Sequence, residues 1–368
     1  KPNPHPYIRV RDLNGKKTLE LDGSFEFVDD ETQKAISRYI VTGGDIVLSI
    51  VGTIGLVSVV GDSLNEANLT ENCVKLTSLS GIDRDYLYYY LKSSYGQQEI
   101  ARGTVGAVQA KLPIKNIQDI SIPLPDEVTQ RKIADILSSL DAKIEVNQRI
   151  NDNLYEIVNA YYTSLFKDVE CEMTTIGNYA ERIYSGGTPT TSNAAYWDGT
   201  FGWFSSGETR NRFVISTEKS ITQTGIDNSS TKLASKHDIV MASAGQGFTR
   251  GQTSMLLIDT YVNQSVIVIH ADRNILPYLF WNLANRYEEL RAISDSSSIR
   301  GSLTTKMIAA FEIPCANNDV IQTFSGFAWA VIPQIENNLL ENERLAALRD
   351  SLLPKLMTGE IDVSAIQL

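Results

Sequence analysis

The sequence predicts an α+β protein with two mixed α/β domains of similar fold, separated by two long antiparallel coiled-coil helices and related by a pseudo-two-fold axis. Three observations predict this architecture: an internal repeat, a common pattern of strands and helices in each copy, and a heptad of apolar residues after each copy. The length of 368 residues is sufficient for two domains of ordinary size.

The internal repeat is the strongest of these signals. Residues 120–154 align with residues 311–345 at an offset of 191, so that Ile122-Pro123 falls on Ile313-Pro314. Further upstream the offset is 192–193, where Asp45-Ile46-Val47 matches Asp238-Ile239-Val240. A single insertion or deletion accounts for this drift, and we infer that the chain contains one unit twice.

The repeat divides the chain into four segments. We expect a first domain at 1–125, a central long helix at 126–172, a second domain at 173–313 and a C-terminal long helix at 314–368. Both domains are rich in β-branched residues and glycine, which indicates short strands joined by turns, with a few helices. Residues 173–202 have no counterpart before Lys1, and we expect the start of the first domain to be missing from this chain.

Each long helix has apolar residues alternately four and three positions apart, which is the spacing of a coiled-coil seam. In the second helix we expect Pro333 to cause a kink or an interruption, and Leu348 to fill the seam where Arg349 breaks it. The predicted seam positions are Ile133, Leu137, Leu140, Ile144, Asn147, Asn151, Leu154, Val158, Tyr161 and Leu165, then Phe324, Ala328, Val331, Ile335, Asn338, Asn342, Leu345, Arg349, Leu352 and Leu356.

The two helices are expected to pair with each other in antiparallel orientation. Each would be about 57 Å long at ~1.5 Å per residue, and the second domain lies between them with short connections at both ends. In a parallel pair this domain would have to span the full helix length, whereas in an antiparallel pair its two ends coincide. We expect the seam asparagines Asn147, Asn151, Asn338 and Asn342 to meet and fix the register; the alternative is an exposed polar gap.

The charge is unevenly distributed. The formal net charge is −11, of which the helical segments 126–172 and 314–368 carry −5 and −4, while the domains 1–125 and 173–313 carry −2 and 0. Acidic helices would repel DNA and suit a protein partner, although a solvated helix face is an alternative explanation. Nearly neutral domains can still bind a duplex through their loops.

Several classes of protein lack support in the sequence. No window is apolar enough for a membrane span, and Cys73, Cys171 and Cys315 are too few and too scattered for a disulfide framework, which favours a reducing cytoplasm. Phosphate-binding loops, zinc spacings and nucleophile elbows are lacking. Asp126 and the Asp141–Lys143 run match a nuclease pattern, but both fall on one predicted helix, about 20 Å apart at ~1.5 Å per residue. We therefore expect no catalytic residue and no metal site.

At this point the sequence resembles a known family, the DNA specificity subunits of type I restriction–modification systems. The resemblance rests on IPLPDEVTQRKIADILSSLD at 122–141 with a weaker copy from 313, SLLPKLMTGEIDV at 351–363, and SGGTP at 185–189. It implies a non-catalytic subunit whose two target-recognition domains each read one half of an asymmetric, interrupted target in double-stranded DNA. It also implies that the helices dock two methyltransferase (M) subunits and then restriction (R) subunits. S-adenosylmethionine, ATP and Mg²⁺ are expected on those partners, and no cofactor is expected in this chain.

Loops of the two domains are the expected DNA-contacting elements, because loops on a rigid scaffold usually carry recognition. Arg and Gln can bond the edges of guanine and adenine, whereas Lys and Ser more often hold phosphates; the alternative for each residue is a solvated surface position. The candidates are Arg9, Arg11, Ser49, Thr53, Gln109, Lys111, Thr188, Ser205, Arg210, Ser243, Gln246, Arg250, Arg300 and Lys306. The aromatic runs at 86–90 and 280–281 are expected to pack in the cores instead.

Two other functions remain open from the sequence alone. A duplicated binding or scaffold module that does not bind DNA, joined by a coiled coil, is the main alternative, and salt-dependent duplex binding would separate the two. A self-contained nuclease or methyltransferase is the enzymatic alternative, which turnover of DNA by the purified chain would support.

Overall fold

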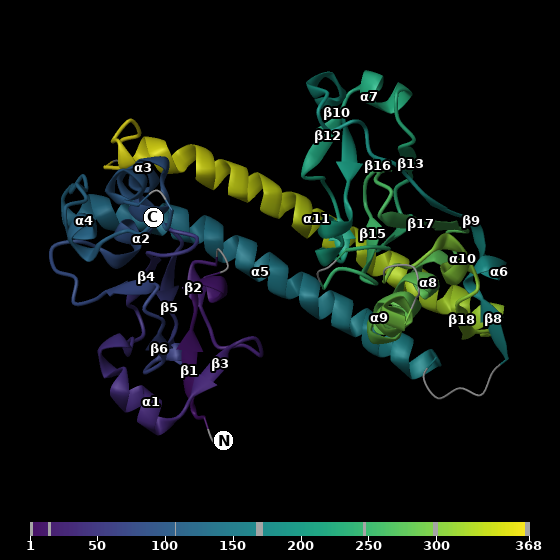
Figure 1. Cartoon of the computed structure of the whole chain (residues 1–368), viewed down its shortest axis with the longest axis horizontal. Helices are drawn as coiled ribbons and strands as arrows, with labels where there is room; N and C mark the ends of the chain where they lie inside the picture. The colour runs from purple at the N-terminus through teal and green to yellow at the C-terminus, as the bar shows by residue number, and fades with distance from the viewer. Residues whose placement is uncertain are drawn as a thin grey trace. The chain divides into compact units, whose positions relative to one another are not determined.

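The structure, a computed structural model, describes residues 3–13, 16–106, 108–166, 172–245, 248–296 and 301–364. The chain separates into two compact units. The first contains Lys1–Val146 and Asn342–Leu368, and the second contains Asn147–Glu341. Each unit holds one mixed α/β domain together with one half of each long helix (Figure 1).

The described residues of the first unit's domain form two small sheets and four α-helices, with short 3-10 turns between them. The sheet orders are β2-β5-β4-β7 and β3-β1-β6. The strands are β1 His5–Ile8, β2 Thr18–Leu19, β3 Glu26–Val28, β4 Ile46–Ser49, β5 Val57–Val60, β6 Asn68–Leu69 and β7 Cys73–Leu76; the helices are α1 Asp30–Ala35, α2 Arg84–Lys92, α3 Ser94–Gly103 and α4 Ile114–Gln118.

The sequence explains why these elements form. Strands β4 and β5 are β-branched runs buried on both faces, and the turn between them uses Gly52 and Gly55 at positive φ. Helix α2 begins where the Asp83 carboxylate accepts a hydrogen bond from the backbone N–H of Tyr86 at 2.9 Å. One core lies between this sheet, α2 and the helix segments that carry Ile133 and Leu353, which fixes the domain on the helices of its own unit.

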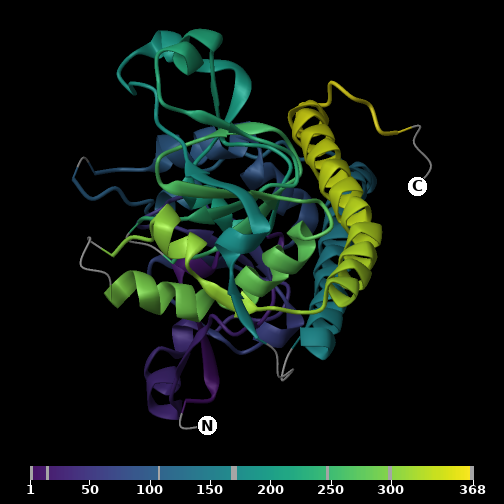
Figure 2. The same cartoon turned by 90° about the vertical axis from the view of Figure 1, so that its right-hand side faces the viewer.

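The domain of the second unit has the same organisation with additional strands. Its sheet orders are β11-β15-β14-β17-β9, β12-β10-β16-β13 and β18-β8. Figures 1 and 2 show the β10–β12 sheet and α7 projecting away from α8, α9 and α10. The strands are β8 Met173–Thr175, β9 Ala180–Ser185, β10 Trp197–Phe204, β11 Phe213–Val214, β12 Lys219–Ile221, β13 Lys232–Ala234, β14 Ile239–Ala242, β15 Thr253–Leu256, β16 Thr260–Val262, β17 Val266–Ala271 and β18 Glu312–Pro314; the helices are α6 Ile176–Tyr179, α7 Gln223–Asp227, α8 Leu276–Asn285, α9 Tyr287–Ser296 and α10 Thr305–Ala309.

The two domains share a strand order, as the repeat predicts. The central antiparallel pair β4–β5 corresponds to β14–β15, and each pair is extended by a parallel strand, β2 or β11, and an antiparallel strand, β7 or β17. The smaller sheets also match, since β10 lies between β12 and β16 as β1 lies between β3 and β6. Strands β8 and β9 have no counterpart in the described part of the first domain.

The long helices are α5 Glu127–Phe166 and α11 Asn318–Met357. In the first unit Arg349 contacts Asp141 and Lys132 contacts the carbonyl of Val363; in the second unit Asn147 contacts Glu341 and Asn151 contacts Asn338. Within each unit the contacts advance along α5 as they recede along α11. The predicted antiparallel pairing is therefore confirmed in each unit, and Figure 2 shows the two helices side by side in the second.

One detail of the helix prediction is wrong, and Pro333 does not cause the interruption that was one of its two expected effects. Helix α11 runs without interruption through Pro333, whose side chain is exposed. Leu348 does not fill the seam: it is 47% exposed, while Arg349 occupies the seam position and pairs with Asp141 at 2.6 Å. A charged residue can occupy a seam when a partner of opposite charge lies across it. The aromatic runs at 86–90 and 280–281 are buried, as expected.

Candidate nucleic-acid interface

In each domain a strand-connecting turn lies beside the segment that joins two helices. In the first domain the N–H of Leu112, between α3 and α4, donates to the carbonyl of Ile50 at 2.9 Å. In the second, the N–H of Leu303, between α9 and α10, donates to the carbonyl of Ser243 at 2.8 Å. We call residues 50–56 with 104–106 and 108–112 the first loop edge, and residues 243–245 and 248–252 with 301–304 the second loop edge. The repeat therefore places the same two loops together in both domains.

The first loop edge brings three predicted residues together. The backbones of Val105 and Lys111 exchange hydrogen bonds of 2.9 Å, closing a short hairpin, and Val51 bridges to Lys111. Thr53, Gln109 and Lys111 all have exposed side chains on these loops. They are free to face a ligand from one edge of the domain.

Ser49 lies at the base of the same turn and is fully buried. Its hydroxyl donates to the carbonyl of Thr53 at 2.6 Å and accepts from the N–H of Leu56 at 2.8 Å. These bonds explain why a serine ends β4: its hydroxyl closes the turn that carries Thr53. In this position it stabilises the turn and is not available to DNA.

Arg9 and Arg11 differ although they are two residues apart. Arg9 donates to both oxygens of Asp12 at 2.9 and 2.8 Å, its side chain is 14% exposed, and these hydrogen bonds raise its pKa. Arg11 is 67% exposed and donates to Glu26 at 2.8 Å. Arg9 therefore holds the start of the domain together, whereas Arg11 remains accessible at its surface.

The buried side chain of Arg250 links the two loops of the second loop edge. Its side chain is 10% exposed, donates to the carbonyl of Gly301 at 2.6 Å and forms an ion pair with Asp295 at the end of α9. Ser243 is also buried. Both residues position the loops rather than presenting donors to a ligand. Gln246 and Arg300 lie outside the described residues.

The remaining candidates lie elsewhere in the second domain. Ser205 caps the turn at Ser206–Arg210 together with Glu208, and the Thr188 side chain contacts Gln264. Arg210 is 55% exposed and pairs with Glu218. Lys306 is exposed on α10. Lys306 and Arg210 thus have accessible cations, while Ser205 has a local structural role.

The SGGTP motif at 185–189 packs against the small sheet. A Cβ on Gly186 would lie 1.9 Å from the carbonyl oxygen of Val262, and one on Gly187 would lie 2.1 Å from the Ser230 hydroxyl. The indole N–H of Trp203 donates to the carbonyl of Gly187 at 3.2 Å. The two glycines are needed for close backbone contact, so the motif connects the two sheets of the domain.

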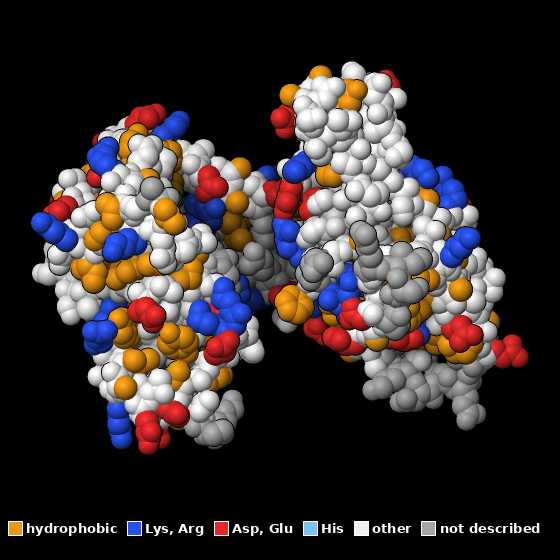
Figure 3. Space-filling model, in the orientation of Figure 1, with side chains coloured by type: hydrophobic (Ala, Val, Ile, Leu, Met, Phe, Trp, Pro, Cys, Tyr) orange, Lys and Arg blue, Asp and Glu red, His pale blue; other side chains and the backbone are white. Residues whose placement is uncertain are grey.

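The electrostatic character of the surface is mixed. Figure 3 shows Lys and Arg side chains interspersed with Asp and Glu on the face of each unit that it presents. A mixed surface attracts phosphates weakly. Selectivity in such a domain has to come from particular loop residues.

The two carboxylates of the nuclease-like pattern, one just before α5 and one within it, have structural roles. Asp126 accepts from the N–H groups of Val128 and Thr129 at 3.0 Å, and these bonds and that of the Thr129 hydroxyl hold its pKa below the ordinary value. Asp141 accepts from Arg349 and from the Tyr89 hydroxyl, both at 2.6 Å. Asp126 caps the helix and Asp141 joins it to α11 and α2.

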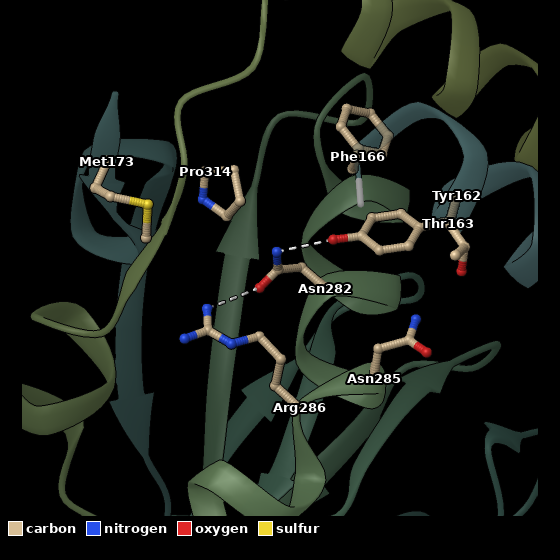
Figure 4. Close-up of a pocket in the computed structure, with 8 residues that line it drawn as sticks. All are labelled: Tyr162, Thr163, Phe166, Met173, Asn282, Asn285, Arg286 and Pro314. Carbon is tan, nitrogen blue, oxygen red and sulfur yellow. Dashed lines mark hydrogen bonds between the residues drawn. The ribbon is translucent and has the colours of Figure 1, made fainter. Parts of the chain in front are cut away.

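A cavity of about 440 Å³ lies in the second unit near the end of α5 (Figure 4). The Tyr162 hydroxyl accepts from Asn282 at 2.9 Å there, and Arg286 is turned to the carbonyl of Glu312 at 2.6 Å. The Asn282 and Arg286 side chains that line it are hydrogen-bonded within the unit, and we assign it no ligand. Within the described residues no group of three His, Cys, Asp or Glu side chains could hold a metal ion, and no helix is long and apolar enough to cross a membrane.

Three exposed apolar residues described on the loop edges were not among the predicted contacts. Val105, Val108 and Phe248 have exposed fractions of 44%, 103% and 87%. The sequence contains a weak signal for such positions, an apolar residue within a glycine-containing turn. The prediction considered only polar residues as base contacts.

Comparison with known proteins gives a consistent result. The model of the type I restriction modification DNA specificity domain matches residues 1–156 and 169–320. The HindI specificity subunit of Haemophilus influenzae is 21% identical, over 68% of this chain and 71% of its own length. The MjaIX specificity subunit of Methanocaldococcus jannaschii is 20% identical, over 98% and 88%. The crystal structure of the type I restriction-modification S subunit from M. genitalium shares the fold, with a TM-score of 0.59 at 17% identity, covering 97% of this chain and 89% of that one.

Proposed function

This chain belongs to the type I restriction–modification DNA specificity family, which confers DNA sequence specificity, and from that premise we propose that each of its domains reads one half of an interrupted duplex target through its loop edge. The observation that carries this proposal is the repeated juxtaposition of the same two loops in both domains. The turn between Ile50 and Gly55 is shorter than the turn between Ser243 and Gly251. Loops of different length and composition suit two different half-sites, hence an asymmetric target.

The exposed members of the predicted set are the proposed contacts. Gln109 and Thr53 are suited to base edges, and the cations to phosphates or guanine. The proposed contacts are Arg11, Thr53, Gln109, Lys111, Arg210 and Lys306, with Gln246 and Arg300 retained from the sequence. Arg9, Ser49, Thr188, Ser205, Ser243 and Arg250 are left out as direct contacts because their side chains are buried or bonded within the domain.

The long helices are proposed to dock the partner subunits. Their segments carry most of the chain's negative charge, which disfavours DNA and suits a protein surface. We propose that two methyltransferase subunits bind there, with restriction subunits joining them in the cytoplasm. S-adenosylmethionine, ATP and Mg²⁺ are proposed to bind those partners, and this chain to supply recognition without catalysis.

Salt dependence of duplex binding by the chain with its methyltransferase partner tests the proposal. We expect affinity to fall as salt rises, because phosphate contacts release counterions, and Lys306→Ala to reduce the slope by about 1. Lys232→Ala is the control, since Lys232 is exposed on β13 of the same domain and is not among the proposed contacts. Binding that is indifferent to salt and sequence would contradict the proposal and favour the scaffold alternative.

A further inference from the structure

Phe248 is the most exposed aromatic side chain among the described residues. Its exposed fraction is 87%, and the next aromatic, Tyr95, is at 45%. It lies in the turn between β14 and β15, on the second loop edge. Burial of a phenylalanine ring is among the larger favourable contributions of any side chain, so a ring exposed on the second loop edge is available to stabilise a complex that covers it.

The turn that carries Phe248 is held in place. The Tyr287 hydroxyl donates to the carbonyl of Phe248 at 2.5 Å, and the N–H of Gln252 donates to the carbonyl of Thr249 at 2.7 Å. The Arg250 side chain donates a hydrogen bond to the carbonyl of Gly301, which links this turn to the segment before α10. A ring on a preorganised turn loses little conformational entropy on binding, so burial of its surface contributes more fully to the free energy of binding.

The first loop edge carries a similar feature on its other loop. Val108 is fully exposed in the hairpin closed by Val105 and Lys111. Val108 lies between α3 and α4, whereas Phe248 lies between two strands, so the two are not copies of one position. Val105, in the same hairpin, is 44% exposed, so Val108 is the more exposed of two apolar side chains on the first loop edge.

We propose that Phe248 acts as an apolar wedge that inserts at a base-pair step of the half-site read by the second domain, with Val108 making the apolar contact of the first. The inference rests on the proposed function. Apolar side chains inserted between base pairs partly unstack them and kink the duplex, at a cost offset by the additional surface brought into contact. A nearly neutral domain gains little from phosphates, and an apolar contact supplies affinity that does not depend on charge.

The test uses the chain in complex with its methyltransferase partner and a duplex selected by the wild-type complex. 2-Aminopurine is placed in turn at each position of the second half-site, apart from the methylated adenine. We expect a fluorescence increase at one step with the wild type and its loss with Phe248→Ala. Phe248→Ala should also bind about ten-fold more weakly, the order of one lost base–aromatic stacking contact, with an unchanged salt slope. Phe248→Leu should retain most of the signal, because leucine also serves as a wedge.

Leu233→Ala is the matched control, because Leu233 is an exposed apolar residue of the same domain on β13, with an exposed fraction of 50%. It should leave affinity and fluorescence unchanged. Equal affinity and equal fluorescence for Phe248→Ala and the wild type overturn the wedge while leaving the proposed function intact. A wild-type complex that selects no duplex overturns the proposed function itself, and the wedge with it.

Discussion

Two arginines have structural roles that their local sequence does not predict. Arg250 was predicted to contact DNA and Arg349 to break the seam, yet each is mostly buried and paired with a carboxylate, Asp295 and Asp141 respectively. The partners lie 45 and 208 positions away in the sequence. Periodicity and composition are properties of the local sequence, so they cannot predict an ion pair between residues that are far apart in the chain.

The Arg349–Asp141 pair allows a direct stability prediction. Burial raises the pKa of Tyr89, and its hydroxyl bond to Asp141 adds to the increase, so this hydroxyl stays protonated and donates to the carboxylate. Arg349→Leu removes the charge opposite Asp141 and should lower the free energy of unfolding by about 1–3 kcal/mol. Thermal or denaturant unfolding of the full chain measures the change.

The triple variant Tyr89→Phe/Asp141→Leu/Arg349→Leu should recover most of that loss, because apolar residues then meet in the seam and no buried Tyr89 hydroxyl is left without its acceptor. Leu348→Ala serves as a control with an effect within about 0.5 kcal/mol, since Leu348 is exposed on the same helix. If Arg349→Leu behaves like this control, the pair does not stabilise the helices as described.

The helices were the most predictable elements. Their seam was read correctly because a heptad is a local pattern, and Ile133, Leu137, Val158, Phe324 and Ile335 are all buried. Of the two expected effects of Pro333, a kink or an interruption, the interruption does not occur. Pro333 lies on an exposed face of α11, where the freed carbonyl can reach water.

The seam asparagines provide a test at the level of the helix pair. Asn338 donates to the side chain of Asn151 at 2.8 Å, and Asn151 donates to the carbonyl of Ile335 at 3.3 Å. We predict that Asn151→Leu/Asn338→Leu raises the free energy of unfolding, because polar seam residues fix register at a cost in stability. Either single variant should be destabilising by about 1 kcal/mol, because it leaves an amide without its partner.

Unfolding of the three variants by denaturant measures these differences. Asn153→Leu, at an exposed position of α5, is the matched control and should change little. A double variant less stable than both singles would mean that the amide pair contributes net stability and that our account of the seam is incorrect.

At the scale of the whole molecule, the repeat gave the common strand order of the domains, and the motifs gave the family. The detailed interface could not be predicted, because the sequence does not show which loop residues remain accessible. Thr53 and Ser49 looked alike in the sequence, but one is exposed and the other closes the turn beneath it. The extra strands β8 and β9 were also beyond prediction from the repeat, which begins after them.

The division of charge is also a property of the whole chain. Acid is concentrated on the helical segments and the domains are close to neutral, which agrees with the proposal that DNA and protein partners bind different parts of the molecule. This division supports the central claim that each domain reads its own half of a target while the helices hold partner subunits.

Selection from a random duplex library by the chain with its methyltransferase partner tests that claim most directly. We expect an enriched sequence with two short specified parts and an unspecified gap. Repeating the selection with Gln109→Ala, on the first loop edge, should relax one part and leave the other unchanged. Enrichment of a single continuous motif, or relaxation of both parts by this one substitution, would contradict the account.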